Sequence, residues 1–140
     1  MPLYTCNVRP GDLTAELKAE IAREITRIHC EVTGAPTAFV QVFFREVPAG
    51  DGFVGGKPFS QATITGLIRA GRSQDDKSKL LFGISGAWSK ITGQAEKDVF
   101  VAVQDVPAKN IVEDGALLPE PGEEEVWLAE HGLADKLGSR

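Results

Sequence analysis

The sequence predicts an α/β (α+β) fold in which two β-α-β units form one four-stranded mixed sheet with two helices on one face. Two observations support this prediction. Strand-like segments alternate with two long stretches of helical periodicity, and short patterns recur in the same order about sixty residues later. The recurring pairs are Val8-Arg9-Pro10-Gly11 with Ile68-Arg69-Ala70-Gly71, Thr33-Gly34 with Thr92-Gly93, and Val47-Pro48-Ala49 with Val106-Pro107-Ala108.

We expect residues 1–140 to form a single domain, because a chain of this length buries a core without disulfides or metals. Its two pseudo-repeats are predicted at about residues 2–58 and 62–115, followed by a C-terminal tail over residues 116–140. Right-handed crossovers make the strands parallel within each unit. One face of the sheet is then left uncovered, which predicts that a partner covers it and that the protein is an oligomer.

The first unit is predicted as strand, helix and strand. Residues 3–8 form a short strand, and Thr14 is positioned as the N-cap of a helix that Gly34 ends. Residues 39–44 are β-branched and aromatic, which predicts a strand buried on both faces. The helix has an apolar stripe at spacings of three and four residues, formed by Leu17, Ile21, Ile25, Ile28 and Val32.

The second unit follows a glycine-rich loop over residues 47–59. Residues 63–69 and 99–103 are predicted as its strands. Ser73 and Asp76 have the capping-box spacing at the start of the intervening helix, which Thr92-Gly93 ends. In the tail, Glu123-Glu124-Glu125 is expected to be solvated, and Val126-Trp127-Leu128 is a candidate for pinning the tail to the body or to a neighbour.

Composition excludes several classes of function. The net charge of −5 and the lack of any Lys/Arg run argue against nucleic acid as a partner. No apolar run approaches the ~20 residues that cross a membrane, and no signal pattern is present, so a cytoplasmic protein is expected. Two Cys and two His predict neither a disulfide framework nor a metal site. The GxGxxG match at residues 50–55 lacks the following helix that dinucleotide binding requires.

Pro2 is a candidate catalytic residue. Trimming of Met1 would leave Pro2 as a free secondary amine, whose pKa near ~8 falls with burial or neighbouring cations. Such an amine can act as a base or an acid near neutral pH. A second-position proline without any role is the alternative.

Three further side chains join this candidate site. His29 flanks the apolar stripe, and the adjacent Cys30 points about 100° away on the helix, so the two cannot pair as a nucleophile and its base. Arg69 and Arg72 bracket the end of a strand and the approach to a capped helix N-terminus, a pattern suited to binding a carboxylate. On spacing alone, the sequence favours a partly buried structural histidine and two surface arginines.

Together these residues resemble the tautomerase superfamily, which uses an N-terminal proline, and within it the cis-3-chloroacrylic acid dehalogenase group. The resemblance covers nearly the whole chain and is strongest over residues 66–73 and 118–123. It implies catalytic roles for Pro2 and for Glu113, which would activate water. It further implies substrate-binding roles for His29, Arg69 and Arg72. The family resemblance also implies the tautomerase fold, a homotrimer, a small carboxylate substrate and no cofactor.

The sequence departs from this group at one position. The dehalogenases carry a tyrosine where Ala102 stands here, which weakens the expectation of hydrolytic dehalogenation. Ala102 and Phe39 are predicted to line the pocket and to suit a flatter, more apolar substrate. We therefore expect a tautomerase acting on 2-oxo acids such as phenylpyruvate. The alternatives are cis-3-haloacrylate dehalogenation or hydration, and a non-catalytic binding module of the macrophage migration inhibitory factor type.

Overall fold

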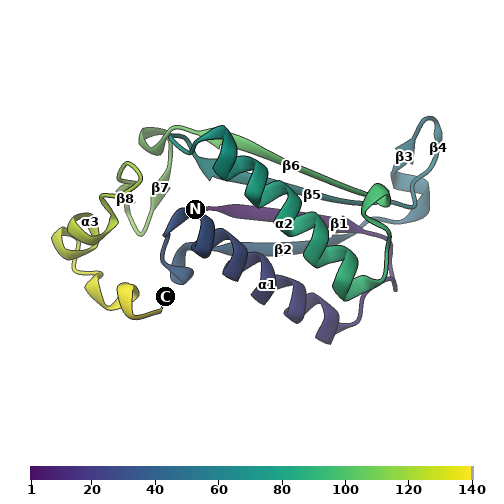
Figure 1. Ribbon diagram of the computed structural model, residues 1–140, viewed down its shortest axis with the longest axis horizontal. Coiled ribbons are helices and arrows are strands. Elements are labelled where there is room, and N and C mark those ends of the chain that lie inside the picture. Colours follow the sequence, from purple (N-terminus) through teal and green to yellow (C-terminus); the bar gives the residue numbers. More distant parts are fainter. Residues whose placement is uncertain (140) are drawn as a thin grey trace.

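The computed structural model describes residues 1–139 and contains the predicted four-stranded mixed sheet (Figure 1). The strands are β1 (Leu3–Val8), β2 (Gln41–Glu46), β5 (Ala62–Arg69) and β6 (Val99–Val106), in the order β2-β1-β5-β6. Strands β1 and β2 pair in parallel, as do β5 and β6, while the central pair β1 and β5 is antiparallel. The two β-α-β units therefore run in opposite directions.

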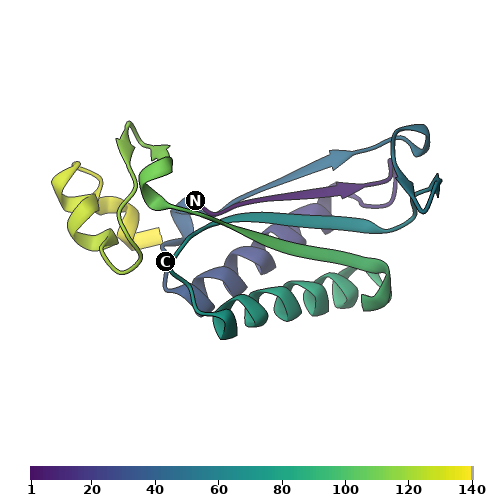
Figure 2. The ribbon, with the colours of Figure 1, turned by 90° about the horizontal axis from the view of Figure 1, so that it is seen from above.

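Both long helices cover the same face of the sheet (Figure 2). Helix α1 (Ala15–Thr33) is capped by Thr14, whose side chain accepts from the backbone N–H of Leu17. Helix α2 (Gln74–Thr92) is capped by Ser73, whose side chain accepts from the backbone N–H of Asp76. Each helix ends at a glycine in the left-handed conformation, Gly34 or Gly93. The capping signals in the sequence are thus confirmed.

The main core lies between this sheet face and the two helices. The helices approach closely at Gly83, where an added Cβ would lie 3.1 Å from Cγ2 of Ile28. This contact explains a glycine inside a helix, where it costs about 1 kcal/mol relative to alanine. The fully buried side chains of this core include Tyr4, Cys6, Ile64, Ile68, Leu80, Ile84 and Trp88.

The other sheet face is uncovered in the single chain. Phe43 and Phe100, on the two edge strands, are 54% and 53% exposed, and Leu67 between them is 37% exposed. The predicted strand over residues 39–44 therefore differs from the observed one in two respects. The strand begins at Gln41, and its alternate residues are exposed. Phe39 instead ends a short 3-10 helix, η1 (Thr37–Phe39).

Smaller elements occupy the two ends of the sheet (Figure 1). One end carries η2 (Ala49–Asp51), β3 (Phe53–Val54), β4 (Lys57–Pro58) and η3 (Glu96–Asp98). The end at which the N-terminus lies carries η4 (Ala108–Asn110), β7 (Val112–Glu113), β8 (Ala116–Leu117), α3 (Glu124–Glu130) and η5 (Ala134–Ser139).

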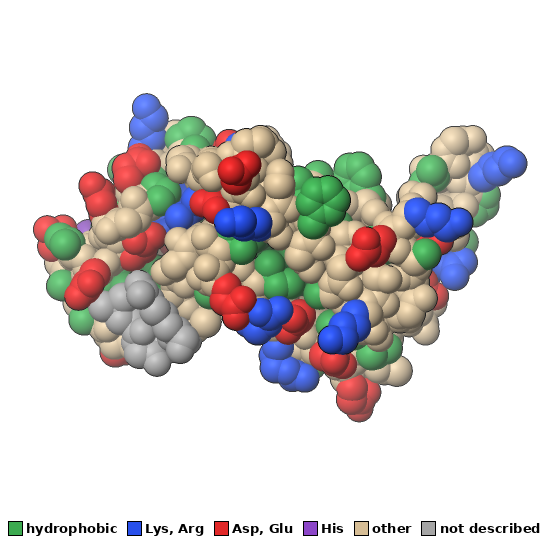
Figure 3. Space-filling model, viewed as in Figure 1, with side chains coloured by type: hydrophobic (Ala, Val, Ile, Leu, Met, Phe, Trp, Pro, Cys, Tyr) green, Lys and Arg blue, Asp and Glu red, His purple; other side chains and the backbone are tan. Residues whose placement is uncertain are grey.

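Acidic and basic side chains are interspersed over the helix-covered face (Figure 3). Within residues 1–139, none of the helices combines the length and the apolar character that a membrane span needs.

Candidate active site

Pro2 is buried at the start of β1, the strand that lies between β2 and β5. Its carbonyl oxygen accepts a hydrogen bond from the backbone N–H of Gln41 at 3.0 Å. Leu3 pairs with Leu67, two residues before Arg69. The antiparallel register therefore brings the N-terminus and the last residue of β5 to the same end of the sheet.

Glu113, in the β7–β8 hairpin, lies at this same end of the sheet. Its Oε1 accepts a 2.5 Å hydrogen bond from the Met1 amino group, and the side-chain amide of Gln41 lies 3.4 Å from the same oxygen. The other oxygen, Oε2, is buried without a hydrogen-bond partner in the described part of the chain. A buried carboxylate oxygen that lacks a partner is an available acceptor for a water molecule or a substrate proton.

The Met1 side chain fills an apolar space beside these polar groups. It is 8% exposed and packs in a second core cluster with Phe39, Leu118 and Trp127. The rings of Phe39 and Trp127 meet edge to face with their centroids 6.2 Å apart. The indole N–H donates to the carbonyl oxygen of Leu117 at 2.8 Å, which satisfies the polar atom of this otherwise apolar wall.

Arg69 lies in the interior, against the C-terminal tail. Its Nη2 contacts Oε1 of Glu124 at 2.5 Å, and its Nη1 donates to the carbonyl oxygen of Pro119 at 2.8 Å. Both side chains of the ion pair are at most 8% exposed. The solvated run expected at residues 123–125 is therefore wrong for Glu124, because its carboxylate turns inward to neutralise a buried guanidinium.

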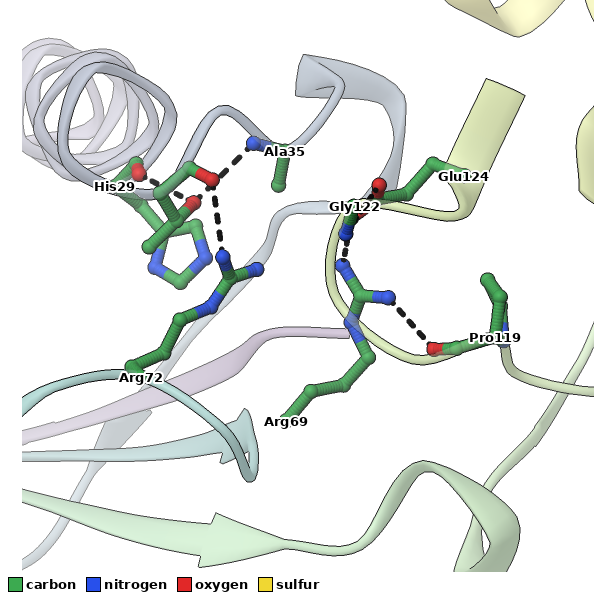
Figure 4. A network of polar contacts seen from close by, with 8 residues as sticks. His29, Ala35, Arg69, Arg72, Pro119, Gly122 and Glu124 are labelled. Atoms are coloured by element: carbon green, nitrogen blue, oxygen red, sulfur yellow. Dashed lines mark hydrogen bonds and ion pairs between the residues drawn. The ribbon is translucent and has the colours of Figure 1, made fainter. Parts of the chain in front are cut away.

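Arg72 points from the start of α2 toward the end of α1 (Figure 4). Its Nη1 donates to the carbonyl oxygen of Thr33 at 3.0 Å, and the figure shows the ring of His29 beside the guanidinium. Burial lowers the pKa of Arg72 from its ordinary value, and the positive charge of Arg69 lowers it further.

His29 is buried and uncharged at neutral pH. Burial lowers its pKa to about 3, and the positive charges of Arg72, Arg69 and the N-terminal amine act in the same direction. The Tyr4 hydroxyl lies 2.8 Å from Nδ1 of His29. Burial raises the pKa of Tyr4, so the phenol is protonated at neutral pH and either donates to Nδ1 or accepts from an Nδ1–H, according to the imidazole tautomer. In the tautomer whose Nδ1 accepts from Tyr4, the imidazole proton is on Nε2, where it is available to donate to a substrate.

The N-terminal amine has a perturbed pKa of its own. Burial lowers the pKa of the Met1 amino group below its ordinary value of 8.0, and the charge of Arg69 adds to this lowering. The hydrogen bond and the negative charge of Glu113 act against it. A lowered pKa increases the fraction of free base at neutral pH, which is the form that accepts a proton.

The structure thus brings together the N-terminus and four of the predicted side chains, His29, Arg69, Arg72 and Glu113. Phe39 lies beside them in the Met1 cluster. Ala102 does not. It pairs with Thr65 in the middle of β6, and because its neighbours Val101 and Val103 pack against the helices, it faces the uncovered side of the sheet.

Sequence reasoning missed two residues of this site. Tyr4 is signalled by strand alternation, since it shares the inward face of β1 with Cys6 and Val8. Glu124 is signalled by its spacing from Trp127, because residues three apart share one face of a helix.

Comparisons with known proteins agree with the predicted family and fold. A family model described as putative oxalocrotonate tautomerase enzyme matches residues 1–131. Among solved structures, N1, a member of the cis-3-chloroacrylic acid dehalogenase family, is 33% identical with a TM-score of 0.91, over 98% of this chain and 99% of that chain. Native Ps01740 is 38% identical with a TM-score of 0.77, over 79% of this chain and 99% of its own.

A third solved structure, a symmetric trimer of the fused 4-OT Q0, is 26% identical with a TM-score of 0.76, over 83% of this chain and 94% of that chain. No curated protein matches the sequence.

Proposed function

The chain belongs to the family of putative oxalocrotonate tautomerase enzymes, and from that premise we propose that it is a cofactor-independent tautomerase of 2-oxo acids. Its substrates are phenylpyruvate-like compounds, and the Pro2 amine is the base that moves the proton. The observation that carries this proposal is the Met1 side chain, which fills an apolar, aromatic-walled space beside Glu113 and the buried arginine.

Removal of Met1 would transfer the free amine to Pro2 and empty that space. A phenyl group could then occupy the position of the methionine side chain, and burying such a group is worth about 1.5–3 kcal/mol. Arg69 and Arg72 supply positive charge for the substrate's carboxylate. The Nε2–H of His29 supplies a donor for the oxygen at C2 of the substrate.

Each group then has a defined step in ketonisation of an enol. The Pro2 nitrogen accepts the proton of the enol O–H, the C2 oxygen becomes a carbonyl, and the electron pair of the C2–C3 double bond takes the proton back from Pro2 at C3. The reverse order forms the enol. Holding the carboxylate fixes C3 against the amine, and such orientation can supply several kcal/mol of the barrier.

A direct test follows the ketonisation of phenylenolpyruvate by its ultraviolet absorbance, alongside an intact mass spectrum of the same sample. We expect activity in the protein that lacks Met1, and little in any fraction that retains it. Full activity in the methionine-bearing form would exclude the Pro2 amine as the base. The absence of activity in the processed form would exclude the tautomerase and leave hydration and the non-catalytic binding module as the remaining hypotheses.

Hydration is the second candidate function, favoured by the unpartnered Oε2 of Glu113. In this reaction Glu113 activates water for attack on a cis-3-haloacrylate, the protonated Pro2 amine gives its proton to the neighbouring carbon, and halide leaves. Chloride release from cis-3-chloroacrylate measures it. Ala102 faces the uncovered side of the sheet, so Ala102→Tyr should raise this rate through the site of a neighbouring copy that covers this face.

We also propose that the protein is a homotrimer. The exposed Phe43, Leu67 and Phe100 on the uncovered sheet face support an assembly that buries them, and a trimer is the state of the similar fused 4-OT structure. Sedimentation equilibrium would test this directly, and a monomeric mass would contradict it.

A further inference from the structure

Helix α3 holds the start of the C-terminal tail firmly against the candidate site. Glu124, at the beginning of this helix, makes a buried 2.5 Å ion pair with Arg69. Trp127 and Leu128, in its middle, are buried in the cluster that contains the Met1 side chain. Moving the helix would expose apolar side chains and break a buried ion pair, so α3 forms a fixed wall of the site.

The chain turns back immediately after α3. Gly132, with a φ of 70°, has the left-handed conformation that favours glycine. Its N–H donates to the carbonyl oxygen of Ala129 at 3.3 Å, and the N–H of Leu133 donates to that of Leu128 at 2.7 Å. These two bonds form a Schellman motif, which ends a helix and brings the next apolar residue back onto it. Leu133 accordingly packs against the Met1 cluster, and Figures 1 and 2 show the chain returning from α3 toward the N-terminus.

The far end of the tail is held by contacts that water can reach. The Lys136 ammonium lies 2.6 Å from Oδ2 of Asp114, and the two side chains are 29% and 25% exposed. The same ammonium lies 5.5 Å from the centroid of the Phe39 ring. Asp114 follows Glu113 in the turn of the β7–β8 hairpin. A partly exposed ion pair is a weak contact, because water competes with it and salt screens it.

The apolar space beside the amine is too enclosed for a substrate to enter without movement of the protein. The Met1 side chain that fills this space is only 8% exposed, and Phe39 in its wall is 4% exposed. A substrate group in the place of Met1 would be enclosed to the same extent. Of the walls described above, the segment that follows Gly132 is the most weakly attached, so it is the wall that moves.

We propose, building on the proposed function, that residues 131–139 form a lid over this space, with a hinge at Gly132 and a latch between Lys136 and Asp114. Glycine accommodates the change of backbone conformation that opening requires, because it has no Cβ. In the closed position Lys136 lies over Phe39 and joins the tail to the β7–β8 hairpin. Closure excludes water from the site while the proton moves. Lys136 is thus a positioning residue that acts through the lid.

The test measures how fast 3-phenylpropanoate, a non-reacting monocarboxylate, binds to and leaves the protein that lacks Met1. Stopped-flow tryptophan fluorescence reports binding, because Trp127 borders the space whereas Trp88 lies in the main core. Lys136→Gln should raise both rate constants by about two- to fivefold, the range for one partly exposed ion pair. The dissociation constant should change less than about twofold, because opening precedes both entry and exit. If Lys136 is part of a fixed wall, only the dissociation rate should rise, and that result would overturn the proposal.

Two variants are matched controls for the latch. Lys136→Arg keeps the positive charge and should show wild-type rates. Lys18→Gln removes an ion pair with Glu46 at the opposite end of the sheet, in which the lysine side chain is 28% exposed, close to the value for Lys136. It should leave both rates unchanged. Equal acceleration in Lys18→Gln and Lys136→Gln would show a general loosening of the protein and would contradict a local latch.

Hydrogen exchange tests the lid without any ligand. Peptides from residues 131–139 should exchange at least about tenfold faster than peptides from α3, and Lys136→Gln should accelerate exchange in the first set alone. Equal protection of the two segments would overturn the lid whether or not the wild type binds 3-phenylpropanoate. None of these measurements needs turnover. A lid in a protein that does not ketonise phenylenolpyruvate would exclude the tautomerase alone, and ketonisation with unchanged rates and exchange in Lys136→Gln would exclude the lid alone.

Discussion

The two ends of the four-stranded sheet are built from equivalent pieces, but they differ in chemistry. Because β1 and β5 are antiparallel, each end combines the start of one unit's strand with the end of the other's. At the candidate site these are Pro2 before β1 and Arg69 at the end of β5. At the opposite end they are Gln61 before β5 and Val8 at the end of β1. The second set carries no ionisable group.

The helix ends show the same contrast in closer detail. Thr33 at the end of α1 donates its hydroxyl proton to the carbonyl oxygen of His29 and accepts from the N–H of Ala35. Thr92 makes the same bonds at the end of α2, to the carbonyl oxygen of Trp88 and from the N–H of Gln94. The backbone is therefore hydrogen-bonded in the same way at both helix ends. The difference lies in the side chain four residues earlier, which is His29 in the polar site and Trp88 in the packed core.

The largest expected difference is between substitutions at Pro2, before β1, and at Gln61, before β5. Pro2→Ala replaces the secondary amine by a primary one with a different pKa and greater freedom. It should lower kcat/KM for phenylenolpyruvate by about 10²–10⁴-fold, the range for a positioned general base. The control is Gln61→Ala at the equivalent start of β5, which should change the rate less than twofold on the basis of its distance from the site. Equal effects of the two variants would contradict the contrast.

A second pair of variants compares the end of α1, at His29, with the end of α2, at Trp88. His29→Gln should lower kcat/KM by about tenfold through the loss of an oriented donor, with a small change in thermal stability. Trp88→Phe should do the reverse. It removes buried volume and the N–H that donates to Oε1 of Gln94, which is expected to destabilise folding by about 1–3 kcal/mol. Chemical denaturation and initial rates measured on both variants test this.

How much of this contrast the sequence could predict depends on the range of each interaction. The helix limits at Thr14, Gly34, Ser73 and Gly93 were predictable because capping is local. The position of Ala102 and the inward turn of Glu124 were not. Both depend on which sheet face is covered and on how the tail folds back over Arg69, and these are contacts between distant segments.

The dependence of stability on pH should carry a signature of His29. Its pKa is about 3 in the folded protein, against an ordinary value of 6.5. Between these pH values the unfolded chain therefore binds a proton at this residue and the folded protein does not. Stability should fall as pH is lowered through this window, by up to about 1.4 kcal/mol per pH unit from this residue. His29→Gln should remove that part of the slope, whereas a parallel profile would show that His29 is protonated in the folded state.

The smallest expected effect concerns the residue that orients His29. We expect the Tyr4 hydroxyl to donate to Nδ1 and so to hold the imidazole proton on Nε2, and Tyr4→Phe removes that donor. The rate should fall by a few-fold, since the ring stays packed and only part of the neutral population then carries the donor toward the site. The decisive measurement is the ¹⁵N chemical shift of the two ring nitrogens, with His131→Gln used to assign the signals. Wild type should show the Nε2–H tautomer and Tyr4→Phe a mixture or the Nδ1–H form. If the shifts are unchanged, then Tyr4 packs against the ring without setting its protonation, and the donor role of His29 would need another support.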